Sequence, residues 1–220
     1  MKIRTVGDLC DRIDEDMAWR RHELSIFNKQ IPPKPCPVQT ALLRSSVALL
    51  YAHWEGHIKN IAYFYLCYLS SQTLRMDELR PELAAMTVRR KIAAAIPSKR
   101  IRVHIDLVRH IREEATSAAK IPNSKEDVRT ESNLSYSVLE DILLSIGCDC
   151  ERYEIYRDLI DEELVNSRNK VAHGEESNIR LPEWEELFRQ IMWIIGDIST
   201  QVQNSAINKT YHLAHMTPIL

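Results

Sequence analysis

The chain has 220 residues, and its 45% hydrophobic and 27% charged residues are typical of a folded protein rather than a disordered one. The 5 glycines are roughly 2% of the chain against a typical ~7%, which argues against β-sandwiches and barrels, because these folds need glycine at turns and bulges. With 29 basic and 31 acidic residues the formal net charge is -2, which excludes the strongly basic character of a protein that wraps DNA.

The apolar residues of the first half recur at helical spacing. A first helix is predicted over residues 6–28, and it ends before residues 31–37, a segment with four prolines that cannot continue a helix. The next segment carries a continuous apolar stripe with steps of four and three residues, which predicts one long helix. The stripe consists of Leu43, Val47, Leu50, Trp54, Ile58, Ile61, Tyr65 and Tyr68. Shorter helices are predicted over 77–96 and 99–120.

The second half begins with a polar segment, residues 121–133, which predicts a loop. Ser135 is the predicted N-cap of a helix over 136–146, and Gly147 closes this helix.

Two more helices complete the predicted fold. One covers about 152–173 and ends at Gly174, and the last begins near Pro182. The inward stripe of the last helix is Trp184, Leu187, Ile191, Ile194, Ile198 and Val202.

These patterns predict an all-α protein, a single elaborated up-and-down helical bundle. No period of 20–50 residues repeats, so a solenoid is not expected. We expect one domain over residues 1–220 with its core at about 5–205, and a tail that frays after about residue 208.

The five cysteines are odd in number and contain no Cys-x-x-Cys pair, which favours reduced thiols over a disulfide framework or a zinc knuckle. The first residues contain no apolar stretch of the kind found in a signal peptide, and no apolar run approaches the ~18 residues of a membrane span. We therefore expect a cytoplasmic protein that does not associate with a membrane.

Charge is divided between two segments of the chain. Residues 89–112 carry eight Arg or Lys and one Asp, whereas residues 140–164 carry nine acids and two arginines. The two segments are either structural neighbours or solvated faces, or the basic segment follows the phosphate backbone of RNA. Under the second interpretation Arg102 and Arg109 are candidate RNA-binding residues, because they project from one side of the same predicted helix.

One stretch departs from an ordinary amphipathic helix, the segment from Asn166 to Gly174. At 100° per residue Arg168 falls beside the apolar face, where a charge needs a partner or a water-filled groove. His173 lies about 140° further round, so the two side chains act together only if the helix end is distorted or a second copy completes the site. A histidine in the last turn before a glycine is also an ordinary helix C-terminus, which leaves a structural interpretation of His173 open.

The segment Arg168–His173 resembles the R-x4–6-H signature of HEPN domains, including the polar residue, Asn169, directly after the arginine. Two further stretches resemble the MAE_28990/MAE_18760-like branch of HEPN nucleases: residues 51–59, and the segment that runs from 131–134 through 143–147. The resemblance spans roughly residues 5–205. It implies a helical bundle, usually dimeric, with metal-independent endoribonuclease activity and a toxin or antiphage role.

The residue types suit RNA cleavage in which the substrate's own 2′-hydroxyl is the nucleophile. Histidine exchanges protons near neutral pH, and a guanidinium holds phosphate oxygens in a bidentate fork. We therefore expect His173 and Arg168 to be catalytic, with Asn169 in a supporting role, and we expect no metal and no cofactor. The candidate RNA-binding residues are Arg102, Arg109 and Lys170.

Two features of the long second helix allow more than one interpretation. Glu55, next to Trp54, either forms a salt bridge within the chain or lines the active groove. His53 and His57 are i,i+4 neighbours that could share a zinc ion, but no third ligand is evident, so no metal site is predicted.

RNA and a second copy of the chain are the expected partners, together with a cognate antitoxin or a defence-system protein. The alternative hypothesis is a non-catalytic helical module that binds a partner protein or RNA through the same groove.

Overall fold

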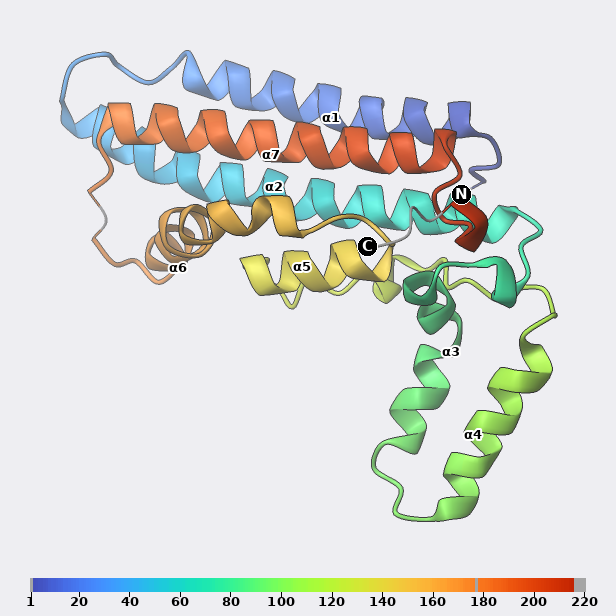
Figure 1. Ribbon diagram of the computed structural model, residues 1–220. Helices are drawn as coiled ribbons and strands as arrows, with labels where there is room; N and C mark the ends of the chain where they lie inside the picture. The colour runs from blue at the N-terminus through green and yellow to red at the C-terminus, as the bar shows by residue number, and fades with distance from the viewer. Residues whose placement is uncertain (1, 177, 216–220) are drawn as a thin grey trace.

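The computed structural model describes residues 2–176 and 178–215, and its helices pack as Figure 1 shows. The helices are α1 (Val6–Asn28), α2 (Pro37–Ser71), α3 (Pro81–Ala95), α4 (Ile101–Glu114), α5 (Tyr136–Ser145), α6 (Ser167–Ala172) and α7 (Leu181–Ile207). The shorter segments are η1 (Met76–Glu78), η2 (Lys125–Asp127), η3 (Glu151–Tyr156), η4 (Leu159–Asn166) and η5 (Leu213–His215). Two isolated bridges are the sole β pairing among the described residues, so the all-α prediction is confirmed.

The three long helices α1, α2 and α7 lie side by side, with α1 antiparallel to the other two (Figure 1). Every residue of the predicted stripe on α2 is at most 3% exposed, and so is every residue of the predicted stripe on α7. These stripes face one contiguous hydrophobic core, because an apolar row at helical spacing is buried when a neighbouring helix covers it.

The boundaries of the first two helices follow from local chemistry. Thr5 and Asp8 form a capping box at the start of α1, where each side chain accepts from the other residue's backbone N–H at 3.0 Å. The prolines that follow α1 keep the chain out of a helix until Pro37, the first residue of α2. The prediction of a helix over 6–28 is confirmed.

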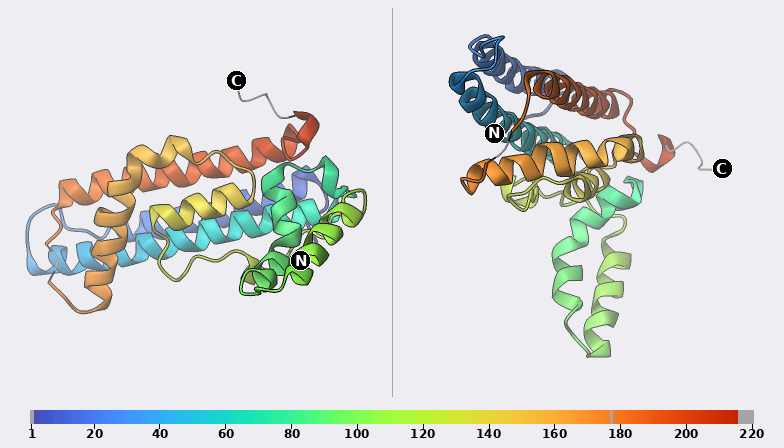
Figure 2. Two further views of the ribbon diagram at one scale, coloured as in Figure 1. Left: turned by 60° about the horizontal axis from the view of Figure 1, so that its bottom comes forward. Right: turned by 90° about the vertical axis from the view of Figure 1, so that its left-hand side faces the viewer.

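The helices α3 and α4 form a hairpin, the arm (residues 81–114), which projects away from the long helices (Figures 1 and 2). Both are shorter than the predicted 77–96 and 99–120. At the base of the arm the backbone N–H groups of Met76 and Asp77 donate to the carbonyls of Ser117 and Ala115 at 3.2 and 2.8 Å. These hydrogen bonds join the segment before α3 to the segment after α4. They are not helical bonds, because helix α3 begins only at a proline.

The predicted cap of α5 is partly wrong. Ser135 is the N-cap, but its side chain makes no capping bond; Asp161 instead accepts from the backbone N–H of Tyr136 at 2.7 Å. Gly147 ends the helix with φ +70°, a left-handed conformation that glycine adopts without strain.

The single α-helix predicted over 152–173 is also wrong in its geometry. The chain is a 3₁₀ segment in η3, a π-helix in η4 and an α-helix only in α6. It turns between η3 and η4, so that η4 and α6 cross the long helices steeply (Figure 2). The turn lets Tyr153 donate to Asp197 of α7 at 2.7 Å while α6 packs against α2.

The described part of the tail, residues 209–215, folds back toward the base of the arm, and the expectation that the tail frays stays a prediction. Tyr211 is 3% exposed, and its carbonyl accepts from the backbone N–H of Arg80 at 3.0 Å. Residues 216–220 lie outside the described residues. Within the described chain, every helix is too short or too polar to cross a membrane.

Candidate functional site

One face of α2 holds the loop that precedes α5. The Tyr51 hydroxyl accepts from the backbone N–H of Leu134 at 2.8 Å, and the indole N–H of Trp54 donates to the carbonyl of Leu134 at 3.0 Å. The hydroxyl of Thr130 donates to Glu55 at 2.5 Å. The three α2 residues are spaced i, i+3 and i+4, which places them on one side of the helix. Glu55 forms no ion pair among the described residues, so its contact within the chain is this hydrogen bond to Thr130 rather than a salt bridge.

The loop itself has an unusual backbone. Glu131 and Ser132 have φ values of 53° and 55°, so two consecutive residues with side chains adopt the left-handed conformation. Each such residue costs on the order of 1–3 kcal/mol, and the surrounding contacts must hold it. The bonds from α2 on either side of this pair provide that restraint, and they direct the carbonyl of Ser132 toward α6.

Arg168 of α6 contacts both the loop and α2. Its guanidinium carbon lies 3.7 Å from the centroid of the Tyr51 ring, and its Nη2 donates to the carbonyl of Ser132 at 3.0 Å. Its Nε is buried and has no hydrogen-bond partner among the described residues. The neighbouring Asn169 donates to the side chain of Asn133 at 3.4 Å. The sequence indicated that Arg168 needs a partner. The structure provides the ring of Tyr51 and the carbonyl of Ser132 in the strained loop.

His173 ends α6 and its ring is exposed. The backbone N–H of Gly174 donates to the carbonyl of Val171 at 3.1 Å, and that of Glu175 to Lys170 at 2.9 Å, with φ +74° at Gly174. This pattern is a Schellman motif, so the structural interpretation is correct for the backbone. The imidazole makes no hydrogen bond or ion pair within the described chain, either with the Arg168 guanidinium or with any other group.

The remaining candidates lie apart from Arg168. Lys170 is exposed and lines a hollow of about 520 Å³ that also contains Glu162, Glu163 and Glu183. Arg102 and Arg109 are on the arm, and Arg109 pairs with Asp106 at 3.1 Å. A single copy therefore brings Arg168, Asn169 and Glu55 to one loop but leaves the arm residues outside this site (Figure 1).

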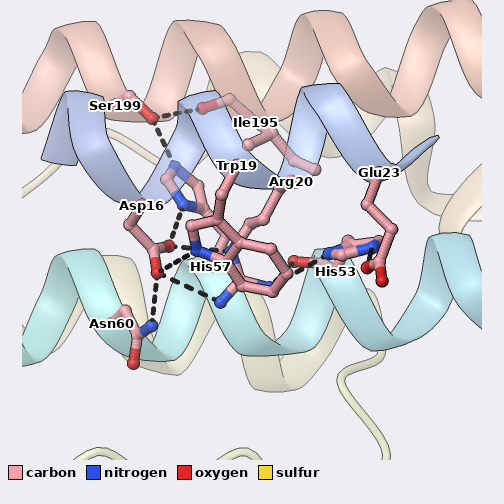
Figure 3. Close-up of polar contacts among 9 residues, drawn as sticks. All are labelled: Asp16, Trp19, Arg20, Glu23, His53, His57, Asn60, Ile195 and Ser199. Carbon is pink, nitrogen blue, oxygen red and sulfur yellow. Dashed lines mark hydrogen bonds and ion pairs between the residues drawn. The ribbon is translucent and has the colours of Figure 1, made fainter. Parts of the chain in front are cut away.

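A second polar cluster joins α1, α2 and α7 in the core (Figure 3). Asp16 accepts from Nε and Nη2 of Arg20 at 2.8 and 3.2 Å, from Nδ1 of His57 at 2.5 Å and from Asn60 at 2.8 Å. Burial opposes ionisation of Asp16, yet the bonds from His57, Arg20 and Asn60 outweigh it and hold its pKa well below the usual value.

His57 links this cluster to α7. Its Nε2 lies 2.9 Å from the hydroxyl of Ser199, which lies 2.8 Å from the carbonyl of Ile195 (Figure 3). Burial lowers the pKa of His57, although Asp16, which accepts a hydrogen bond from Nδ1–H, opposes this effect. The order Ser199, His57, Asp16 matches that of a serine hydrolase triad, but His57 is 0% exposed, so we assign the cluster a structural role. Both ring nitrogens are engaged by protein groups, which leaves neither for a zinc ion.

The sequence did not reveal this cluster, because Asp16 and Arg20 look like an ordinary surface pair at i,i+4. Gly56, in the middle of a long helix, is the one signal that could have indicated it. A Cβ at Gly56 would lie 2.9 and 3.1 Å from the guanidinium nitrogens of Arg20. The glycine therefore lets the buried arginine approach the backbone of α2.

We expect Gly56→Ala to destabilise the protein by about 1–3 kcal/mol, the usual cost of overpacking a filled site. The matched control is Gly7→Ala, also in a helix, where the new Cβ would meet only the Thr5 hydroxyl at 3.7 Å. The control should be neutral or stabilising by up to about 1 kcal/mol. Urea denaturation of both variants measures the difference, and equal stabilities would contradict this role of Gly56.

The fold and the site together define a helical bundle that carries an Arg-x4-His motif next to a loop held by its second helix, which is the class of HEPN domains. The family model for RiboL-PSP-HEPN matches residues 15–204. The chain belongs to this family, which confirms the HEPN resemblance; the narrower MAE_28990/MAE_18760-like branch stays a prediction. A search of the curated proteins and a search of the solved structures each find no match.

The three sequence segments that carried the resemblance meet in space. Tyr51 and Glu55 come from the first, Ser132 and Asn133 from the second, and Arg168 from the third. The sequence alone indicated no role for Tyr51, Ser132 or Asn133, although each lies inside one of these segments. Membership of the family supports a nuclease-type function in general terms.

Proposed function

We propose that the chain is a metal-independent endoribonuclease of HEPN type, a toxin or an antiphage effector, that acts as a homodimer. The observation that carries this proposal is the held guanidinium of Arg168 on the same short helix as the exposed imidazole of His173. The stacking on Tyr51 fixes the plane of the guanidinium, and a fixed cation stabilises developing charge without reorganisation.

In the proposed reaction His173 takes the proton from the 2′-hydroxyl of the substrate, whose oxygen attacks the adjacent phosphorus. Arg168 stabilises the charge that develops on the phosphate oxygens. The 5′-oxygen leaves and takes up a proton from a histidine, which gives a 2′,3′-cyclic phosphate and a 5′-hydroxyl. Asn169 supports the loop side of the site, and Glu55 acts indirectly by holding Thr130. The purified protein should cut single-stranded RNA with EDTA present and leave these ends.

The alternative, a non-catalytic module that binds a partner protein or RNA, also has an observation in its favour. Arg168, Asn169 and Glu55 are each already engaged by the loop or its flanks. In this alternative the motif fastens the loop, and His173 is a helix end. RNA binding without any cleavage, in a preparation free of a copurified inhibitor, would favour the module.

We expect a two-fold dimer that buries the surroundings of residues 165–175, because Arg168 and His173 diverge on one helix and a second copy can complete the site. Light scattering at tens of micromolar should give twice the chain mass. Ala172→Arg, a large cation at an exposed position of α6, should shift the mass toward the monomer. A wild-type monomer under these conditions would contradict the proposed assembly.

We also propose that Lys170 and the arm residues Arg102 and Arg109 contact the phosphate backbone of RNA. Replacing both arginines by glutamate should weaken RNA binding and reduce the slope of log K against log salt by about 1 for each phosphate that is no longer neutralised. The matched control replaces Arg12 and Arg21, which lie on α1 and not on the arm. An unchanged salt slope would exclude Arg102 and Arg109 from the RNA path.

A further inference from the structure

The outer surface of α4 carries an apolar row that nothing in the described chain covers. Ile101, Ile105 and Val108 are 70, 48 and 50% exposed, and with Arg112 they follow each other at steps of four, three and four residues. This spacing places them in one line along the helix, the apolar row. The row borders a groove of about 540 Å³, and α4 has no buried residue at all. An amphipathic helix with a bare apolar side is typical of a docking surface.

The arginines at the two ends of the row, Arg100 and Arg112, form no ion pair among the described residues. The described residues contain no ion pair between the basic segment 89–112 and the acidic segment 140–164; the arginines of the basic segment that form ion pairs do so with Asp127 and Asp106. The two segments are neighbours where α3 packs against α5, and Arg89 and Asp141 line one hollow there, but no ion pair joins them among the described residues. Arg112 lies in the row, and Arg100 lies at its start, where α4 begins.

The acidic segment presents a complementary surface, which we call the acidic ridge: Glu151, Glu154, Ile155 and Asp158. Ile155 is 81% exposed, the most exposed of the large apolar residues described. The arginines nearby are used internally, Arg152 by Asp149 and Asp197, and Arg157 by Glu154 and the Tyr136 ring. Within the described part of the chain, no ion pair engages the carboxylates of Glu151 and Asp158, on either side of Ile155.

We propose that the apolar row of one copy docks on the acidic ridge of a second copy, and that the second copy returns the contact. Isoleucine meets isoleucine at the centre, and arginines at the row's ends meet the carboxylates of the ridge, the usual arrangement of an apolar core with a charged rim. A two-fold axis makes each contact twice, which brings the buried area toward the about 1,200–2,000 Å² of stable interfaces. Exposed isoleucines are poor contacts for a phosphate backbone, so the row favours protein over RNA.

Chemical cross-linking between copies tests this proposal without RNA and independently of cleavage. A tagged Ile105→Cys variant is mixed with an untagged Ile155→Cys variant and treated with a short flexible bismaleimide. We expect a covalent tagged–untagged product well above that obtained when Ile207→Cys, 55% exposed before substitution, replaces the ridge variant. Wild-type mixtures measure the background from Cys10 and Cys36. Equal yields with the two untagged variants would overturn the proposal.

Charge exchange provides the second measurement. Arg112→Glu in the row variant should reduce the cross-linked yield several-fold, and Glu151→Arg with Asp158→Arg in the ridge variant should restore it. Val108→Ser should also reduce the yield while RNA affinity holds, because it removes apolar surface and adds no charge beside Arg109. If Val108→Ser leaves the yield unchanged and weakens RNA binding, the row is an RNA surface and the proposal is wrong.

Discussion

His173→Ala should reduce RNA cleavage in EDTA by roughly 10²–10⁴-fold, the contribution typical of a general acid or base. The imidazole makes no hydrogen bond or ion pair within the described chain, so its removal should leave stability almost unchanged, by less than about 0.5 kcal/mol. Gel analysis of labelled RNA and urea denaturation of the same preparation give the two readouts. If the His173→Ala variant melts early and keeps full activity, His173 only caps the helix and is not catalytic.

Arg168→Ala should cost a comparable factor in cleavage, because it removes the cation at the phosphate. Removing a charge from an apolar edge could be stabilising, but the structure indicates the opposite. Arg168 stacks on Tyr51 and donates to Ser132, and a hydrogen bond from a charged group contributes about 1.5–3 kcal/mol. Arg168→Lys is the matched control, since it keeps the charge and loses the planar stack.

Cleavage that stops with EDTA alone would show that the chemistry depends on a metal, and the roles of Arg168 and His173 would then be wrong. A mixture of the two alanine variants gives further information on assembly. If each site takes Arg168 from one copy and His173 from the other, mixed dimers contain one intact site and regain part of the activity.

Asp16→Ala should destabilise the protein by about 3–5 kcal/mol, a large part of the stability of a domain of this size. The side chain accepts four hydrogen bonds, and its loss leaves Arg20, 8% exposed, and the buried His57 without their acceptor. Urea denaturation followed by circular dichroism measures the change.

The control is Asp11→Ala on the same helix, an exposed position at which the change should stay within about 0.5 kcal/mol. Asp16→Asn keeps the shape and removes the charge, so an intermediate loss is expected. If Asp16→Ala and Asp11→Ala are equally stable, the cluster does not hold the long helices together. The cluster lies on the same helix, α2, as Tyr51, Trp54 and Glu55, which hold the loop. Its loss should therefore also loosen the loop that contacts Arg168.

The spacing of the apolar residues and the residues that begin and end helices determined the long helices. The stripe on α2 and the capping box of α1 are local features, because burial of a helix face and closure of a helix end depend on residues within a few turns. The middle of the chain could not be derived in this way. The π-helix of η4 and the turn before it depend on what Tyr153 and Arg168 contact on different helices.

The same division applies to the candidate site. The sequence by itself determined the motif, the all-α class and the two segments of opposite charge, because residue type and spacing carry that information. Only the tertiary structure decided that Tyr51 lies under Arg168, that Ser132 adopts a left-handed backbone to reach it, and that Asp16 is buried. Such contacts join residues 33 to 142 positions apart in the chain, as the bond from Arg20 to His53 and the hydrogen bond between His57 and Ser199 illustrate. No local pattern encodes such pairs, since each partner alone looks like an ordinary helical residue.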